Sequence, residues 1–181
     1  MTFDLQPTDL KNKLVQLIPL QQEEFETLYK VASDPLIWEQ HPEKNRYQRQ
    51  VFQNYFEGAM GSGGAFLIFD VKTGEPIGSS RFYEYDSEKS SVTIGYTFLA
   101  RDHWGTTYNR AVKSLMLDHA FRFVENVIFH IGANNIRSQK AIEKLGAKKI
   151  TELEMNYYGE QPQLNFVYCI NKKDWERIKN L

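Results

Sequence analysis

Residues 94–113, IGYTFLARDHWGTTYNRAVK, hold the pattern that decides the fold. The apolar run over 94–99 predicts a strand, and apolar residues over 107–123 recur every three or four positions, which predicts a helix. The first turn of a helix leaves backbone N–H groups without partners, and the helix dipole adds positive potential there. Gly105, Thr106 and Thr107 are small enough for a ligand to approach, and Thr107 is placed to cap the helix. The loop therefore predicts an anion site suited to a pyrophosphate, although an ordinary capped helix has the same pattern.

Residues 135–145 predict a second helix, which Asn134 or Asn135 can cap and which ends at Gly146. Ser138 lies on its apolar stripe, in register with Ala141, Ile142 and Leu145. A hydroxyl on a buried stripe needs a partner. It either bonds to a carbonyl of the preceding turn or points into a site between the two helices, and the sequence leaves both open.

The rest of the chain predicts strands over 14–20, 65–70, 77–85, 91–99, 127–131 and 164–170, and helices over 23–32, 47–59 and 172–179. The glycine-rich stretch 58–64 is interpreted as a connection, because a phosphate-binding glycine loop follows a strand and precedes a helix. Residues 1–13 are expected to form a loosely held arm, and Asp118 and His119 to lie on a solvated helix face. Together these elements predict one mixed α/β domain over residues 1–181.

Composition narrows the function classes. The chain has 181 residues, 22 Lys and Arg, and 23 Asp and Glu, so its net charge of −1 carries no attraction for nucleic acid or membranes. The single cysteine, Cys169, excludes an internal disulfide or a cysteine-based zinc site and is expected to be an inert thiol. The histidines have no metal-ligand spacing, so no metal is expected. With no apolar run of about 20 residues and no signal-peptide core, a cytoplasmic location is expected.

The chain contains four short motifs in this order: Ile94-Gly95-Tyr96, Trp104-Gly105-Thr106, Asn135-Ile136-Arg137-Ser138 and Glu143-Lys144-Leu145-Gly146. In that order and spacing they resemble the GNAT N-acetyltransferase superfamily, and within it the ribosomal-protein N-terminal (RimJ/RimL-like) branch. The resemblance extends over residues 14–170. It implies a GNAT-like acyl-CoA N-acyltransferase fold, with a six- or seven-stranded mixed sheet that splays open between the strands at 91–99 and 127–131. It also implies that acetyl-CoA enters the splay.

The resemblance further implies roles for individual residues. The backbone of Phe98 and Leu99 would pair with the pantetheine arm, Asn135 would bind near it, and Ser138 would protonate the departing thiolate. The pyrophosphate would be held by the loop residues Trp104, Gly105, Thr106, Thr107, Tyr108 and Asn109. The reaction implied is direct attack of a primary amine on the thioester, without an acyl-enzyme. Residues expected beside the acceptor are Trp38, Tyr83, Glu84 and Tyr96.

Two positions depart from the family pattern. Ile142 stands where many relatives carry a tyrosine acid, which leaves Ser138 as the acid candidate. Thr93 stands where the branch often carries a glutamate base, and Glu84, Asp86 and His103 are nearby substitutes. An α-amine has a pKa near 7.7–8.0 against about 10.4 for lysine, a difference of about 3.4 kcal/mol in the cost of deprotonation. A site without a strong base therefore favours the α-amine of a peptide or protein.

Three functions remain open from the sequence. The first is transfer to a peptide or protein N-terminus, and the second is transfer to a small or xenobiotic amine. The third is a CoA-binding sensor or scaffold with weak catalysis, which remains open because Thr93 and Ile142 replace the usual base and acid. The protein is expected to act as a monomer or a homodimer.

Overall fold

The fold is built on one mixed sheet whose centre is strand β4 (Ser91–Leu99). The computed structural model describes residues 2–156 and 161–179. Within them the strands follow the order β1-β2-β3-β4-β5-β7-β6, and every neighbouring pair is antiparallel except β4–β5. The other strands are β1 (Val15–Pro19), β2 (Ala65–Asp70), β3 (Pro76–Asp86), β5 (Asn126–Gly132), β6 (Lys148–Met155) and β7 (Gln163–Asn171). The mixed α/β architecture predicted from the sequence is confirmed.

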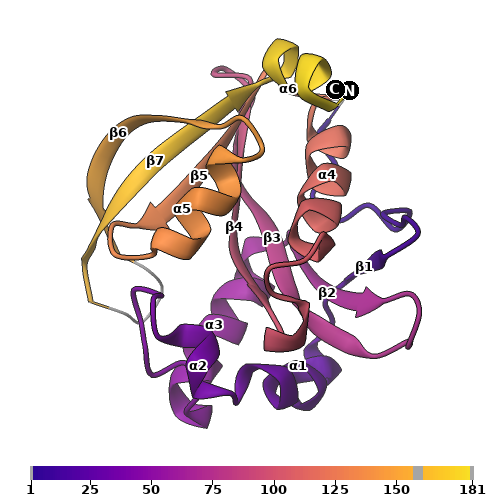
Figure 1. Ribbon diagram of the computed structural model, residues 1–181, viewed down its shortest axis with the longest axis vertical. Helices are drawn as coiled ribbons and strands as arrows, with labels where there is room; N and C mark the ends of the chain where they lie inside the picture. The colour runs from indigo at the N-terminus through magenta and orange to yellow at the C-terminus, as the bar shows by residue number, and fades with distance from the viewer. Residues whose placement is uncertain (1, 157–160, 180–181) are drawn as a thin grey trace.

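Helices cover both faces of this sheet (Figure 1). Helices α1 (Phe25–Ala32), α2 (Pro35–Trp38) and α3 (Arg49–Ser62) form one group. Helices α4 (Tyr108–Ala120) and α5 (Ile136–Glu143) lie apart from them, and α6 (Lys172–Lys179) ends the chain. Side chains alternate along β2, so that Phe66 joins the core under α4 while Leu67 joins the core under α3. The sheet is therefore packed on both faces.

Strands β4 and β5 diverge, and this divergence creates the site. They pair only between Ser91–Thr93 and Asn126–Ile128. Beyond Thr93 the register of β4 on β3 shifts, and Tyr96 adopts a φ of 52°, the mark of a bulge. The Tyr55 hydroxyl of α3 donates a 2.6 Å hydrogen bond to the Tyr96 carbonyl and holds the bulge in place. The β5-facing edge of β4 is therefore left without a strand partner beyond Thr93.

The N-terminal arm is packed, so the expectation that it is loosely held is wrong for residues 2–13. Phe3 and Leu10 are buried in the core under α4. The Phe3 ring lies 5.3 Å from Phe82 and 5.4 Å from Phe123. His119, expected on a solvated face, is buried beneath the arm, with its Nε2 atom 2.7 Å from the Asp4 carbonyl oxygen. A few apolar residues far from any periodic segment hold the arm, and sequence periodicity does not detect them.

Two other expectations are corrected. Helix α3 continues through the glycine-rich stretch and ends at Gly63, which has a left-handed φ of 62°. Its buried face of Tyr55, Phe56 and Ala59 packs firmly enough to offset the cost of glycine in a helix. Strand β6 was not predicted, because its sequence, KKITELEM, is charged and exposed at the edge of the sheet. None of the described helices is both long enough and apolar enough to span a membrane.

Candidate active site

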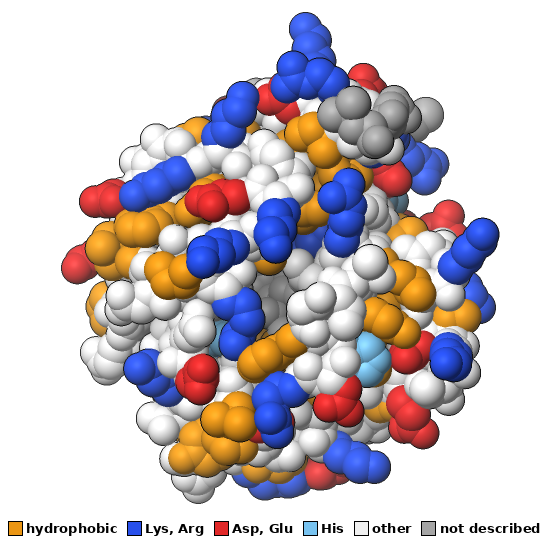
Figure 2. Space-filling view, in the orientation of Figure 1, with side chains coloured by type: hydrophobic (Ala, Val, Ile, Leu, Met, Phe, Trp, Pro, Cys, Tyr) orange, Lys and Arg blue, Asp and Glu red, His pale blue; other side chains and the backbone are white. Residues whose placement is uncertain are grey.

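A cleft of about 530 Å³ opens where β4 and β5 diverge. Its walls are the second half of β4, the loop that precedes α4, the end of β5 and the start of α5. Figure 2 shows the molecule hollowed near the middle of this face, with Lys and Arg side chains around the hollow. Segments that are far apart in the sequence therefore meet around one cavity.

The charge of this cleft is one-sided. None of the described lining residues is Asp or Glu. The lining cations are Arg46, Arg110, Lys113, Arg137, Lys140 and Lys144. Such a wall attracts a ligand that carries several negative charges. The chain as a whole is near neutral, so the cation excess is local to this cavity.

The start of α4 has the features of an anion site. Thr107 occupies the N-cap position, but its hydroxyl makes no capping hydrogen bond, so the expected capping by this side chain is wrong. Gly105 adopts a left-handed φ of 68°, a conformation that strains other residues. Among the described residues, no acceptor lies on the N–H groups of Gly105, Thr107 or Asn109. These donors line the cleft at the positive end of the helix dipole.

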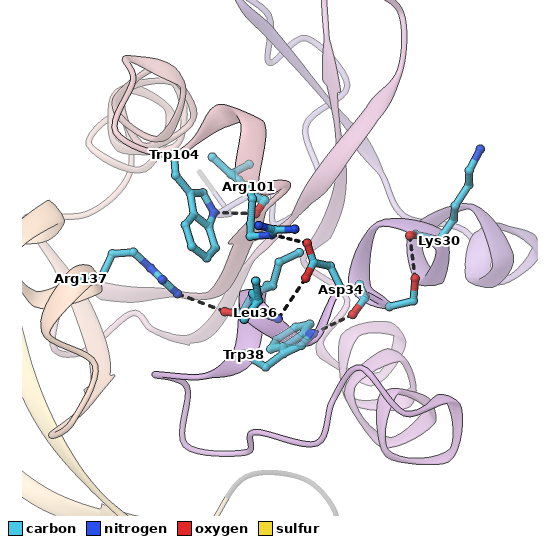
Figure 3. Close-up of polar contacts among 11 residues, drawn as sticks. Lys30, Asp34, Leu36, Trp38, Arg101, Trp104 and Arg137 are labelled. Atoms are coloured by element: carbon cyan, nitrogen blue, oxygen red, sulfur yellow. Dashed lines mark hydrogen bonds and ion pairs between the residues drawn. The ribbon is translucent and has the colours of Figure 1, made fainter.

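The loop is fastened from two sides (Figure 3). The indole Nε1 of Trp104 donates a 2.9 Å hydrogen bond to the Leu99 carbonyl. The Arg137 guanidinium stacks 3.8 Å from the centre of the Trp104 ring, and its Nη2 donates a 3.1 Å hydrogen bond to the Ile37 carbonyl. Arg137 thereby joins α5, the loop and α2. The sequence contained Arg137 inside a family motif, but its role became visible only in three dimensions.

The start of α5 settles which asparagine caps it. Asn135 is 3% exposed, and its Oδ1 accepts a 3.1 Å hydrogen bond from the Ser138 backbone N–H. Ser138 is half-buried on the cleft wall. The described hydrogen bonds include none from its hydroxyl to a carbonyl of the preceding turn. This absence, together with the place of Ser138 on the cleft wall, favours the second of the two arrangements that the sequence left open.

Replacing Asn135 by alanine should destabilise the protein by about 1 kcal/mol, the usual cost of losing an N-cap. The buried amide is the acceptor for the first turn of α5, and alanine leaves that turn without a partner. Urea denaturation of the ligand-free protein measures the change. Asn134→Ala is the matched control, because Asn134 is exposed, and it should leave the free energy of unfolding unchanged. Equal losses in both variants would contradict the capping role.

The opposite end of the cleft is aromatic. Tyr83 and Tyr96 line it together with His41, His130 and Arg46. Their rings are close: Tyr83 lies 5.3 Å from Tyr96 and 6.1 Å from His130. Burial lowers the pKa of His41 to about 3, and the neighbouring charge of Arg46 adds to this effect, so His41 is neutral at physiological pH.

Behind this aromatic end lies a buried arginine. Arg81 is 3% exposed, and its guanidinium stacks 3.8 Å from the centre of the Tyr96 ring. Its Nη2 donates a 3.1 Å hydrogen bond to the Tyr55 carbonyl. Burial lowers the pKa of this guanidinium, but such a group keeps its proton in proteins. Arg81 therefore holds the Tyr96 side chain at the bulge of β4.

Most of the residues that the sequence nominated come together in this cleft. Its lining includes Tyr83, Tyr96, Phe98, Leu99, Trp104, Gly105, Thr106, Thr107, Asn109, Asn135 and Ser138. Trp38 and Tyr108 are turned elsewhere: the Trp38 indole is fully buried and donates to the Ala32 carbonyl, and the Tyr108 hydroxyl donates to Asp70. Glu84 lines a separate cavity next to the cleft.

The three residues named as substitutes for the glutamate base, His103, Asp86 and Glu84, lie in different parts of the structure. His103 lies 3.3 Å from the Asp70 carboxylate at the α4 end of the cleft, and Asp86 forms an ion pair with Lys89 in the β3–β4 turn. Glu84 is the one that approaches Thr93, with 3.4 Å between Oε2 and the threonine hydroxyl. Among the described residues no group of three or more metal ligands gathers.

The comparisons with known proteins agree with this geometry. A family model described as "Acetyltransferase (GNAT) domain" matches residues 15–148. The chain belongs to the GNAT acetyltransferase family. Members of this family transfer the acetyl group of acetyl-CoA. The search of curated proteins found no match.

Solved structures share the GNAT fold at low sequence identity. A GCN5-related N-acetyltransferase from Brucella melitensis has a TM-score of 0.78 and 16% identity, over 94% of this chain and 81% of that one. Mycobacterium smegmatis RimJ, solved with CoA-disulfide, has a TM-score of 0.69 and 16% identity, over 92% and 88%. The spermidine N-acetyltransferase of Vibrio cholerae, solved with CoA and spermine, has a TM-score of 0.66 and 15% identity, over 91% and 99%. At identities of 15–16% the likeness shows the fold.

Proposed function

We propose that this GNAT protein transfers the acetyl group of acetyl-CoA to a primary amine, and that the favoured acceptor is the α-amine of a peptide or protein N-terminus. The observation that carries the proposal is the cleft itself, in which an unpaired strand edge adjoins a helix start with unpartnered N–H groups. Backbone N–H groups on that edge of β4 are suited to polarise a thioester carbonyl. Acetyl-CoA supplies the activated acetyl group, and the chain binds, orients and moves protons.

The binding assignments follow from the two ends of the cleft. We assign the backbone of Phe98 and Leu99 to the pantetheine arm and residues 104–109 to the pyrophosphate. The cation-rich lining without described carboxylates and the free amides of the loop support this fit. In this scheme Tyr108 supplies no free donor, because its hydroxyl donates to Asp70 and its backbone N–H donates to the Thr106 hydroxyl at 3.3 Å. Asn135 fixes the start of α5 beside the pantetheine.

Ser138 is assigned to protonate the departing thiolate. Ser138 lines the cleft, and its hydroxyl has no described protein partner, which supports the role. Ile142, one turn further along α5, is buried and cannot donate a proton. Ser138 is therefore the donor that this face of α5 offers near the cofactor.

The place of the single cysteine supports direct attack by the amine, because this thiol is poorly suited to form an acyl-enzyme. Cys169 lies in β7 outside the described cleft lining, and burial raises the pKa of its thiol, so little thiolate forms at physiological pH. In our scheme the acetyl group therefore passes straight to the acceptor nitrogen.

The preference for an α-amine has two supports. Such an amine gives up its proton near pH 8, whereas lysine holds it to about pH 10.4, so the α-amine needs only a weak base. In addition, the described lining contains no carboxylate to bind the second cation of a polyamine. A small-amine acceptor remains the alternative that the test below separates.

An acceptor panel tests the function. We expect CoA to be released faster with a peptide that has a free α-amine than with the same peptide carrying a blocked N-terminus and a free lysine. The rate should also exceed those with propylamine and spermidine. Thiol release measures the rate, and mass spectrometry locates the acetyl group. Faster transfer to propylamine would support a small-amine enzyme instead. Binding of acetyl-CoA with no transfer to any amine would overturn the proposal in favour of a sensor or scaffold.

A further inference from the structure

A chain of polar groups leads out of the acceptor end of the cleft. The Tyr83 hydroxyl lies 3.2 Å from Nδ1 of His130, and the same nitrogen lies 3.9 Å from Oε2 of Glu84. That oxygen is also 3.4 Å from the Thr93 hydroxyl. The four residues come from three adjacent strands, β3, β4 and β5. The sheet therefore assembles a polar chain that sequence spacing alone does not reveal.

The chain connects two cavities. Tyr83 lines the main cleft, and Glu84 and Thr93 line a second, more open cavity beside the β3–β4 turn. Among the described residues, His130 is the one that lines both. Its side chain is 10% exposed, whereas the Glu84 side chain is 58% exposed. The buried Nδ1 atom of His130 therefore lies 3.9 Å from a carboxylate that is in contact with water.

The inner end of this chain lies beside β4 where the thioester is proposed to lie. A Cβ atom placed on Gly95 would come within 3.0 Å of the Tyr83 hydroxyl oxygen. Gly95 thus leaves room for a hydroxyl directly over the bulged strand. An amine approaching this part of β4 would meet the Tyr83 hydroxyl before any described carboxylate.

We propose that Tyr83, His130 and Glu84 form the proton exit for the acceptor amine. This inference rests on the proposed N-acetyl transfer. The ammonium N–H bond breaks as its proton moves to the Tyr83 oxygen, and the tyrosine proton moves in turn to Nδ1 of His130. The imidazolium, which the Glu84 carboxylate 3.9 Å away stabilises, then releases the proton to water in the second cavity. The neutral amine keeps the electron pair that forms its bond to the acetyl carbon, and no oxidant or reductant is required.

The surroundings of His130 suit a proton acceptor. Burial lowers the pKa of the imidazole, so the ring is neutral and can accept a proton at physiological pH, and the charge of Glu84 counteracts part of this effect. The titratable groups that the described structure places against the ring are Tyr83 and Glu84, both on β3. From β4 the neighbour is Thr93, and Val167 of β7 pairs with His130; neither side chain titrates in this range.

The pH dependence of transfer tests the exit. At pH 7, His130→Gln should lower kcat/KM for the accepted amine at least tenfold, with the rate rising as pH rises towards the pKa of the acceptor itself. An alkoxyamine of the same skeleton is already unprotonated at pH 7, so the variant should acetylate it at the native rate. A purely structural role would slow both acceptors alike. Affinity for CoA, measured by calorimetry, should stay unchanged.

Two carboxylates provide a matched pair of variants. Glu84→Gln should lower kcat/KM several-fold at pH 7, because the imidazolium loses its anion, whereas Glu88→Gln in the same cavity should match the native protein. A native pH profile in His130→Gln, while the native protein acetylates amines, would overturn the exit alone. If the native protein binds acetyl-CoA and acetylates no amine, the proposed function fails and the proton exit fails with it.

Discussion

Replacing Asn109 by aspartate should weaken acetyl-CoA binding at least tenfold, about 1.4 kcal/mol. Asn109 lies in the first turn of α4 and lines the cleft next to the unpartnered N–H groups of Gly105 and Thr107. A carboxylate there would repel a pyrophosphate that those groups are proposed to hold. The same charge is favourable for the ligand-free helix, because it lies at the positive end of the helix dipole.

The two effects of Asn109→Asp therefore have opposite signs, and together they separate loss of binding from loss of folding. Calorimetry with acetyl-CoA should show the weaker Kd, while the thermal midpoint of the ligand-free variant should be equal to the native value or higher. Asn109→Ser, which adds no charge, is the control. Native affinity in the aspartate variant would show that the pyrophosphate lies elsewhere. If the native protein failed to bind acetyl-CoA, the proposed function would be wrong.

Replacing Lys113 by methionine should stabilise the protein at pH 7 and remove a rise of stability with pH. Lys113 is 3% exposed, and burial lowers its pKa to about 7 from the usual 10.5. Its described hydrogen-bond partners are the hydroxyls of Thr97 and Ser80, with no carboxylate. Those hydroxyls also lie 2.7 Å from one another, so loss of the ammonium leaves them paired.

The direction follows from proton binding. Between about pH 7 and 10.5 the unfolded chain keeps the Lys113 proton that the folded chain releases, so stability rises with pH across that window. A shift of this size corresponds to a penalty on the order of 5 kcal/mol below pH 7, where both states are protonated. Urea denaturation at pH 6.5, 8 and 9.5 measures the difference between native and variant. Lys173→Met, at an exposed position, should leave the pH dependence unchanged, and an unchanged slope in Lys113→Met would contradict the prediction.

The parts of the fold that the sequence predicted are those coded locally. Strand β4, the loop at Gly105 and the helices α4 and α5 each follow from periodicity or from a terminal residue within a few positions. The sequence does not predict strand β6, because an exposed edge strand has no apolar face that would produce a periodic pattern. It does not predict the packed arm either, since the partners of Phe3 are distant in the chain.

The site divides in the same way. The residues that we propose to bind the cofactor lie in two short segments of the chain, and the sequence nominated most of them. The acceptor side is assembled from separate strands: Tyr83 and His130 are 47 positions apart, and their contact depends on the order of β3, β4 and β5. Trp38 was expected beside the acceptor, but packing against Phe98 and Tyr55 buries it completely. Local patterns do not predict which aromatic side chains tertiary packing buries.

Arg137 has a consequence for how the two substrates influence each other. Its guanidinium stacks on Trp104, at the end of the cleft assigned to the cofactor, and donates to the carbonyl of Ile37, a residue that also lines the cleft. A ligand that shifts either contact acts on the same side chain. Were acetyl-CoA to shift the Trp104 contact and an acceptor the Ile37 contact, their affinities would be thermodynamically linked, and each would change the other by the same factor.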